Sequence, residues 1–158
     1  MEASPFTVRE LRSDDEITSA FPLMSSLRDR IAAGTFLFEV RKQQLQGYEL
    51  LGAFDGPRLV ALAGVRRTHT LSRGEHLFVD DLVTDESVRG HGHGRKLMEW
   101  LERRCANEGI AKIYLDSRIT ARGFYERIGF TFQTSIPCWK DVSGGERETR
   151  STGRKGEQ

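Results

Sequence analysis

The segment VRGHGHGRKL, residues 88–97, places three glycines at alternate positions directly before a predicted helix. The first four N–H groups of a helix have no partner within it, and the helix dipole adds partial positive charge there. Glycines let an anion approach this backbone without a Cβ atom in the way, and flanking arginines add charge. These residues are Arg89, Gly90, Gly92, Gly94 and Arg95. The pattern predicts a phosphate-binding loop, with a plain glycine-rich turn as the alternative; it is not a Walker loop, because no Gly-Lys-Ser/Thr follows.

Neighbouring carboxylates form a second group with chemical potential. Asp80 and Asp81 lie in the apolar segment HLFVDDLVT, and on a strand their side chains would point to opposite faces. A carboxylate among apolar residues is costly unless it is paired. Each is therefore either a general base or the partner of an arginine, for which the candidates are Arg66, Arg89 and Arg118. Asp116, at the end of the next predicted strand, is a further candidate base.

The elements that position these residues follow from hydrophobic periodicity and turn residues. We expect strands at 6–11, 76–84 and 110–117, a hairpin over 49–67 around Asp55-Gly56-Pro57, and one or two final strands within 129–142. We expect helices at 14–31 with an interruption at Pro22, at 35–46 ending at Gly47, at 94–108 ending at Gly109, and at 120–128 ending at Gly129. Hairpin strands followed by strand–helix–strand predict an α/β or α+β fold with a mixed sheet.

Length, composition and charge limit the function classes. A chain of 158 residues with 37% hydrophobic and 30% charged residues fits one soluble domain. The net charge of +1 gives no support to a nucleic-acid or membrane-surface role, and no apolar run is long enough to span a membrane. The beginning of the sequence lacks the features of a secretory signal. Cys105 and Cys138 have no CxxC spacing, which favours reduced thiols in a cytoplasmic protein and leaves a disulfide as the alternative.

Two motifs together resemble a known family. The run from Arg89 to Gly94 matches the Arg/Gln-x-x-Gly-x-Gly/Ala loop of the GNAT superfamily of acetyl-CoA-dependent N-acetyltransferases. The segment RITARGFYERIGF, residues 118–130, resembles the second signature of that family, on Ala121, Phe124, Tyr125, Gly129 and Phe130. One predicted helix and one strand separate the motifs, as in the family, and VDDLVTDE resembles its small bacterial HPA2-like branch.

The resemblance implies a fold and a domain extent. It implies a GNAT domain over residues 1–142, with a mixed, mostly antiparallel sheet of about six or seven strands flanked by about four helices. Residues 143–158 contain no apolar residue except glycine and predict a disordered tail. Because dimers are common in the family, the resemblance leaves a homodimer through the late strands as an alternative to a monomer.

The resemblance also implies an activity: acetyl transfer from acetyl-CoA to a primary amine of a small molecule or peptide, by direct attack in a ternary complex. It assigns the catalytic base to Asp80 and the acid for the leaving thiolate to Tyr125. It assigns coenzyme binding to the backbone of Leu82, Val83 and Thr84, to the loop residues Arg89, Gly90, His91, Gly92, His93, Gly94 and Arg95, and to Arg118, whose alternative is pairing with Asp116.

Other readings of the same residues remain open. His91 and His93 could suggest a metal, but the remaining histidines lie on separate elements, so we expect no metal. The chain could be an inactive acyl-CoA sensor or interaction module, a nucleotide-binding module, or a structural protein whose glycine loop is a bare turn. Binding of acetyl-CoA in preference to ATP or NAD would separate the coenzyme-binding readings from the last two.

Overall fold

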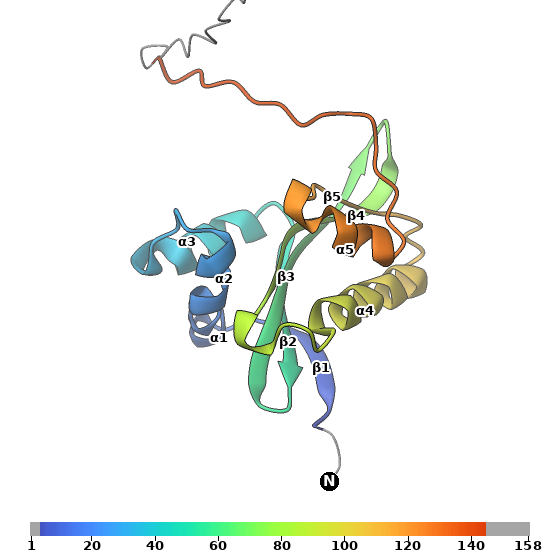
Figure 1. Ribbon diagram of the computed structural model, residues 1–158. Coiled ribbons are helices and arrows are strands. Elements are labelled where there is room, and N and C mark those ends of the chain that lie inside the picture. The colour runs from blue at the N-terminus through green and yellow to red at the C-terminus, as the bar shows by residue number, and fades with distance from the viewer. Residues whose placement is uncertain (1–3, 145–158) are drawn as a thin grey trace, which may run out of the picture.

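The strands form one sheet whose order follows the chain, β1-β2-β3-β4-β5 (Figure 1). The computed structural model describes residues 4–144. The strands of this part are β1 (Phe6–Glu10), β2 (Tyr48–Asp55), β3 (Arg58–Thr70), β4 (Gly74–Thr84) and β5 (Ile113–Leu115). Its α-helices are α1 (Asp14–Ser19), α2 (Phe21–Leu27), α3 (Ala33–Gln44), α4 (His93–Glu108) and α5 (Arg122–Arg127), with 3-10 turns η1 (Glu86–Val88) and η2 (Ile119–Ala121).

The sheet is mixed, as predicted. Strands β1 to β4 are antiparallel to their neighbours, and β5 runs parallel to β4. The predicted hairpin is confirmed: β2 and β3 pair from Tyr48↔Arg66 to Asp55↔Arg58, around a turn in which Gly56 has φ +57°. A positive φ is easily adopted by glycine, so this residue permits the tight reversal.

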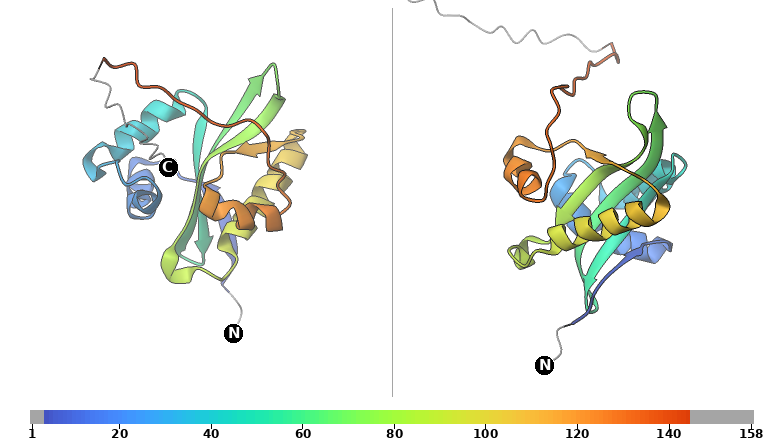
Figure 2. Two further views of the ribbon diagram at one scale, coloured as in Figure 1. Left: turned by 45° about the horizontal axis from the view of Figure 1, so that its top comes forward. Right: turned by 90° about the vertical axis from the view of Figure 1, so that its right-hand side faces the viewer.

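Helices cover both faces of the sheet (Figure 2). Helices α1, α2 and α3 lie on one face, where Ile17, Phe36 and Leu62 belong to one buried apolar cluster. Helix α4 packs on the other face, where Leu97 and Leu101 join a second cluster with side chains of the sheet. Both faces of β3 are therefore buried, which explains the nearly continuous apolar run in its sequence.

Helix α4 confirms the prediction for residues 94–108. Leu97, Met98, Leu101 and Cys105 are buried and form the apolar stripe expected from helical spacing. Gly109 follows the helix with φ +72°, the left-handed conformation that commonly ends helices.

The segment predicted as one helix over residues 14–31 forms two. The interruption is confirmed, but it falls at Ala20, which ends α1 and begins α2, and Pro22 lies in the first turn of α2. Proline fits there because its missing N–H would have no helical partner. Ser13 and Glu16 form a capping box that fixes the start of α1. The helix predicted at 35–46 begins two residues earlier, at Ala33.

The prediction of final strands within 129–142 is wrong, and the sheet therefore has fewer strands than the six or seven expected. Residues 131–142, here called the arm, form neither helix nor strand; they are exposed, and after passing the β3–β4 hairpin the arm extends beyond the body (Figures 1 and 2). A strand needs a ladder partner for its backbone, and no described strand pairs with the arm. Strand β5 is also shorter than the predicted 110–117. The predicted tail lies outside the described residues apart from Ser143 and Gly144.

Candidate active site

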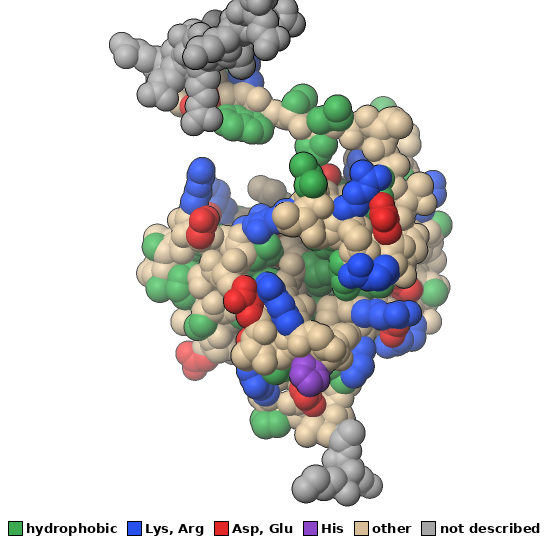
Figure 3. All heavy atoms as spheres, in the orientation of Figure 1, with side chains coloured by type: hydrophobic (Ala, Val, Ile, Leu, Met, Phe, Trp, Pro, Cys, Tyr) green, Lys and Arg blue, Asp and Glu red, His purple; other side chains and the backbone are tan. Residues whose placement is uncertain are grey.

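A cavity of about 580 Å³ opens where β4 and β5 separate. The two strands pair only from Leu77↔Ile113 to Val79↔Leu115, and β4 then continues to Thr84 with no described strand on that side. The edge of β4 over residues 80–84 therefore faces the cavity with backbone groups available to a ligand. Basic side chains lie on the surface around the hollow, which is lined in part by apolar groups (Figure 3).

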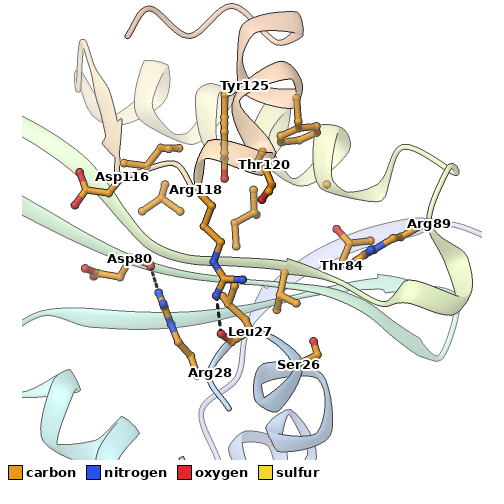
Figure 4. A pocket seen from close by; sticks show the side chains of 17 residues that line it. Ser26, Leu27, Arg28, Asp80, Thr84, Arg89, Asp116, Arg118, Thr120 and Tyr125 are labelled. Carbon is orange, nitrogen blue, oxygen red and sulfur yellow. Dashed lines mark hydrogen bonds between the residues drawn. The ribbon is translucent and has the colours of Figure 1, made fainter. Parts of the chain in front are cut away.

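The cavity gathers predicted site residues from four separate segments. Its walls include Asp80, Leu82, Val83, Thr84, Arg89, Gly94, Arg118 and Tyr125, all predicted from the sequence (Figure 4). The other predicted loop residues, Gly90, His91, Gly92, His93 and Arg95, are not among the lining residues, although they lie at the start of α4 beside it. The structure thus brings the strand edge, the glycine loop and the tyrosine to one place.

The glycines of the loop have two different roles. Gly90 and Gly92 have φ +86° and +73°, and Gly92 caps the start of α4 in the left-handed conformation. Gly94 has ordinary helical geometry, but a Cβ atom there would lie 3.1 Å from Thr84 Oγ1 and 3.5 Å from the Phe124 ring. The first two therefore shape the turn, and the third lets the helix approach the strand closely.

Side chains around the loop differ in their surroundings. Arg89 is exposed and pairs with Glu86 at 3.2 Å, so only a weak surface interaction holds it. Arg95 pairs with Glu99 on α4. His93 is buried and stacks on the Phe6 ring at a centroid distance of 6.0 Å, and its Nδ1 has no hydrogen-bond partner among the described residues. His93 therefore packs as part of the body rather than pointing at the cavity.

Tyr125 lies at the wall opposite the free edge of β4. Its ring is held edge-to-face by Phe124 and Phe130, at centroid distances of 5.1 and 5.4 Å. Its hydroxyl points into the cavity (Figure 4). Burial raises the pKa of the phenol above its ordinary value, so the group keeps its proton throughout the neutral range.

Asp80 and Asp81 have different partners, but the prediction that they point to opposite faces is wrong: the strand pairing is irregular here, and both side chains line a second hollow beneath α2 and α3. Both carboxylate oxygens of Asp80 accept hydrogen bonds from Arg66, at 2.6 and 2.9 Å, so the predicted alternative of pairing with this arginine is realised. This bidentate bond raises the pKa of the Arg66 guanidinium. Asp80 nevertheless also lines the cavity.

Asp116 lies at the same end of the cavity as Asp80 (Figure 4). The pairing of β4 with β5 ends at Val79 and Leu115, and Asp80 and Asp116 are the residues that follow. It is exposed and forms no ion pair within residues 4–144. The alternative that Arg118 pairs with Asp116 is not realised. Arg118 instead donates a hydrogen bond across the cavity to the carbonyl oxygen of Leu27, at 2.9 Å.

The end of α2 is the part of the site that sequence reasoning missed. Ser26, Leu27 and Arg28 line the cavity on the side facing Arg118. Arg28 donates hydrogen bonds to Asp81 Oδ1 and to the Asp80 carbonyl oxygen, at 2.8 and 2.7 Å. The only sequence signal was an arginine at the end of an apolar helix, which by itself is compatible with a solvated side chain.

The described part of the chain has few other features that indicate a function. No group of three or more metal-ligating side chains occurs among those residues. No helix between residues 4 and 144 has both the length and the apolar composition needed to cross a membrane. Cys105 is buried, Cys138 is exposed, and both are free thiols.

Comparison with known proteins gives a family and a fold. The model of the acetyltransferase (GNAT) family matches residues 11–130. An uncharacterized N-acetyltransferase of Bacillus subtilis, YhdJ, is 29% identical over 134 residues, covering 82% of this chain and 94% of that protein. Glucosamine 6-phosphate N-acetyltransferase of Arabidopsis thaliana is 23% identical over 137 residues, covering 82% and 92%.

Solved structures show the same fold at low sequence identity. The aminoglycoside N-acetyltransferase AAC(6')-Iy in complex with CoA superposes with a TM-score of 0.75 at 14% identity, covering 89% of this chain and 97% of that one. Ribosomal-protein-alanine N-acetyltransferase from Brucella melitensis gives 0.74 at 18% identity, covering 87% and 99%. These likenesses concern the arrangement of the chain and carry no information on the acceptor.

Proposed function

We propose, from the premise that this chain belongs to the acetyltransferase (GNAT) family, that it transfers an acetyl group from acetyl-CoA to a primary amine. The observation that carries the proposal is the cavity in which a free strand edge, a glycine-capped helix start and a buried tyrosine meet. Acetyl-CoA would supply the thioester, and the acceptor would be an amine of a small molecule or peptide. An inactive acyl-CoA-binding module is the alternative, and no observation in the described structure favours it.

The cavity fits an elongated ligand with phosphates at one end. Unpaired N–H groups at the start of α4 suit a pyrophosphate, and Arg89 and Arg118 add positive charge. The backbone of Leu82, Val83 and Thr84, on the free edge of β4, would pair with the amides of the pantetheine arm. The N–H group of Leu82 would stabilise negative charge developing on the thioester oxygen.

Two side chains would move the protons. An alkylamine has a pKa of about 10, so it arrives mostly protonated at neutral pH and needs a base. We assign that base to Asp80, which would take the proton directly or through water. To do so, its carboxylate would break its hydrogen bonds with Arg66. The amine nitrogen then bonds to the carbonyl carbon, the carbon–sulfur bond breaks, and Tyr125 gives its proton to the leaving thiolate. The second proton that the nitrogen loses as it becomes an amide restores the Tyr125 hydroxyl.

Replacing Tyr125 by phenylalanine is expected to lower turnover by about 100-fold, the lower end of the range that general acids contribute, because the ring stays and only the proton donor is lost. Affinity for coenzyme A should stay within about fivefold of the unchanged chain, since a neutral hydroxyl contributes roughly 1 kcal/mol. Steady-state kinetics and calorimetry measure the two quantities. Tyr114→Phe is the matched control, because Tyr114 lies on β5 outside the cavity lining. Equal turnover in both variants would reduce Tyr125 to a packing residue.

The finer assignments stay predictions. Two free cysteines support a reducing compartment such as the cytoplasm. Assignment to the HPA2-like branch rests on the resemblance of VDDLVTDE alone. The glucosamine 6-phosphate specificity in the name of the Arabidopsis relative makes an amino sugar phosphate a reasonable first acceptor to screen.

We also propose a homodimer in which the arm of each copy lies against β5 of the other. Ile136, Trp139 and Val142 of the arm are 85%, 89% and 86% exposed, so a second copy would have three apolar side chains to cover. A groove of about 720 Å³ lies beside β5, with no described strand along its outer edge. The arm of a second copy would fill this groove, and the arm of the first copy would fill the groove of the second. The same contact between arm and groove would therefore be made twice. Light scattering should give twice the chain mass of 17.9 kDa and a lower mass for Trp139→Glu; a monomer in both cases would exclude the dimer.

A further inference from the structure

Three polar side chains form a connected group beneath the free edge of β4. The Tyr48 hydroxyl, from β2, donates to Asp81 Oδ2 at 2.8 Å, and Arg28 Nε, from the end of α2, donates to Asp81 Oδ1 at 2.8 Å. Tyr48 and Asp81 are only 4% and 8% exposed. Burial, and then the negative charge of Asp81, raise the pKa of Tyr48, so its hydroxyl remains a donor. We call Tyr48, Asp81 and Arg28 the clamp.

The clamp holds an irregularity in β4. Gly64 pairs with Asp81 and Val65 pairs with Val79, so Asp80 is an extra residue, a β-bulge. Arg28 Nη2 donates to the carbonyl oxygen of this extra residue at 2.7 Å, while Nε of the same guanidinium binds the Asp81 side chain. A single arginine thus holds both the backbone and the following side chain of the bulge. The free edge begins at the same point.

The opposing strand leaves room for the clamp. A Cβ atom on Gly64 would lie 2.0 Å from Tyr48 Oη and 2.5 Å from Asp81 Oδ2, both far too close. Glycine inside a strand normally weakens the strand. Here the space that a side chain of residue 64 would fill is occupied by the hydrogen bond between the Tyr48 hydroxyl and the Asp81 carboxylate. The sequence of β3 is therefore adapted to the clamp.

Stability alone does not explain a buried charged group. Replacing buried ion pairs by apolar residues of similar volume is often neutral or stabilising, so such groups can serve to select one conformation. The conformation selected here is the bulge, which lies directly after the last residue of β4 that pairs with β5 and directly before residues 82–84. A regular strand would shift the register by one residue and reverse the faces of those side chains.

We infer that Tyr48, Asp81 and Arg28 are positioning residues that keep the edge of β4 in the register that binds acyl-CoA. The inference rests on the proposed function, because the ligand of that edge is the coenzyme. None of the three needs to react with the substrate. If the clamp is weakened, the edge of β4 has the binding register in a smaller fraction of molecules. The apparent dissociation constant for coenzyme A then rises in inverse proportion to that fraction.

Tyr48→Phe is the sharpest test, because Tyr48 lies outside the cavity lining, whereas Arg28 lies on it. We expect the Kd for coenzyme A to rise about three- to tenfold, corresponding to a competent fraction of roughly 10–30%. Amide hydrogen exchange of residues 80–84, followed by NMR without ligand, should also become faster. Ile17→Val is the control: it removes one methylene from a fully buried residue in α1, so it should lower stability without changing either quantity.

A pair of substitutions at Asp81 separates clamp geometry from folding. Asp81→Asn keeps an acceptor for Arg28 and places an amide donor toward the Tyr48 oxygen, so the Kd should stay within about twofold. Asp81→Ala removes both bonds and should weaken binding at least as much as Tyr48→Phe. If Tyr48→Phe binds coenzyme A like the unchanged chain, the inference is wrong, whatever the exchange rates. If the unchanged chain binds no coenzyme A, it is the proposed function that fails.

Discussion

Substitution of Gly92 by glutamate is expected to weaken coenzyme A binding by at least about 100-fold, which corresponds to a loss of roughly 3 kcal/mol. Gly92 caps α4 with φ +73°, a conformation that costs a non-glycine residue about 1–2 kcal/mol. No atom lies within 4 Å of a Cβ atom placed there, so the new side chain has room. The main effect is therefore the placement of a carboxylate where unpaired N–H groups would hold a phosphate.

Gly47→Glu is a closely matched control for this prediction. Gly47 has φ +85° and equally open space around its Cβ position, but it follows the carboxyl end of α3, where carbonyl groups rather than N–H groups lack helical partners. The two variants should lose similar folding stability in thermal unfolding. Only Gly92→Glu should lose coenzyme A binding in calorimetry. Retained affinity in Gly92→Glu would mean that the glycine loop is a turn and holds no phosphate.

Substitution of Asp80 by asparagine should lower turnover by about 10²–10⁴, the range that general-base catalysis contributes. The amide oxygen can still accept one of the two hydrogen bonds from Arg66, and the other is lost because the amide nitrogen is a donor. The amide cannot take the proton of the ammonium group. Coenzyme A affinity should change little. The loss should shrink as the pH approaches about 10, because the neutral amine then predominates without a base.

Asp116→Asn provides the comparison, because Asp116 lies at the same end of the cavity and is the other candidate base. We expect its turnover to stay within about threefold of the unchanged chain, since base catalysis would then rest on Asp80. If the large loss follows Asp116→Asn instead, the base is Asp116, and the bond between Asp80 and Arg66 is structural. A loss in Asp80→Asn that does not depend on pH would also contradict a role in deprotonation.

The parts of the site that the sequence could predict are those encoded in short continuous segments. The spacing of Gly90, Gly92 and Gly94 indicated the loop, and the motif around Tyr125 located the tyrosine on the next helix. Both depend on residues that act within one turn or one helix. The structure places Gly94 and Tyr125 on the same cavity, although 31 positions separate them in the chain.

The clamp could not be predicted, because it depends on pairs of residues far apart in the chain. Arg28 and Asp81 are 53 positions apart, and Tyr48 and Asp81 are 33 apart. The position of the bulge is a property of two strands together: a family resemblance can imply that this strand bulges, but no pattern within β4 places the bulge at Asp80. The same reasoning explains the missing final strands: the arm has strand-like composition, but pairing is decided by the neighbour available to it.

The most direct test of the account is a calorimetric titration of the purified chain with acetyl-CoA, with ATP and NAD as controls. Acetyl-CoA is expected to bind with a dissociation constant in the micromolar range, equivalent to about −8 kcal/mol, while neither control binds. Absence of acetyl-CoA binding, or preferential binding of ATP or NAD, would contradict the assignment of the cavity between β4 and β5 to coenzyme A.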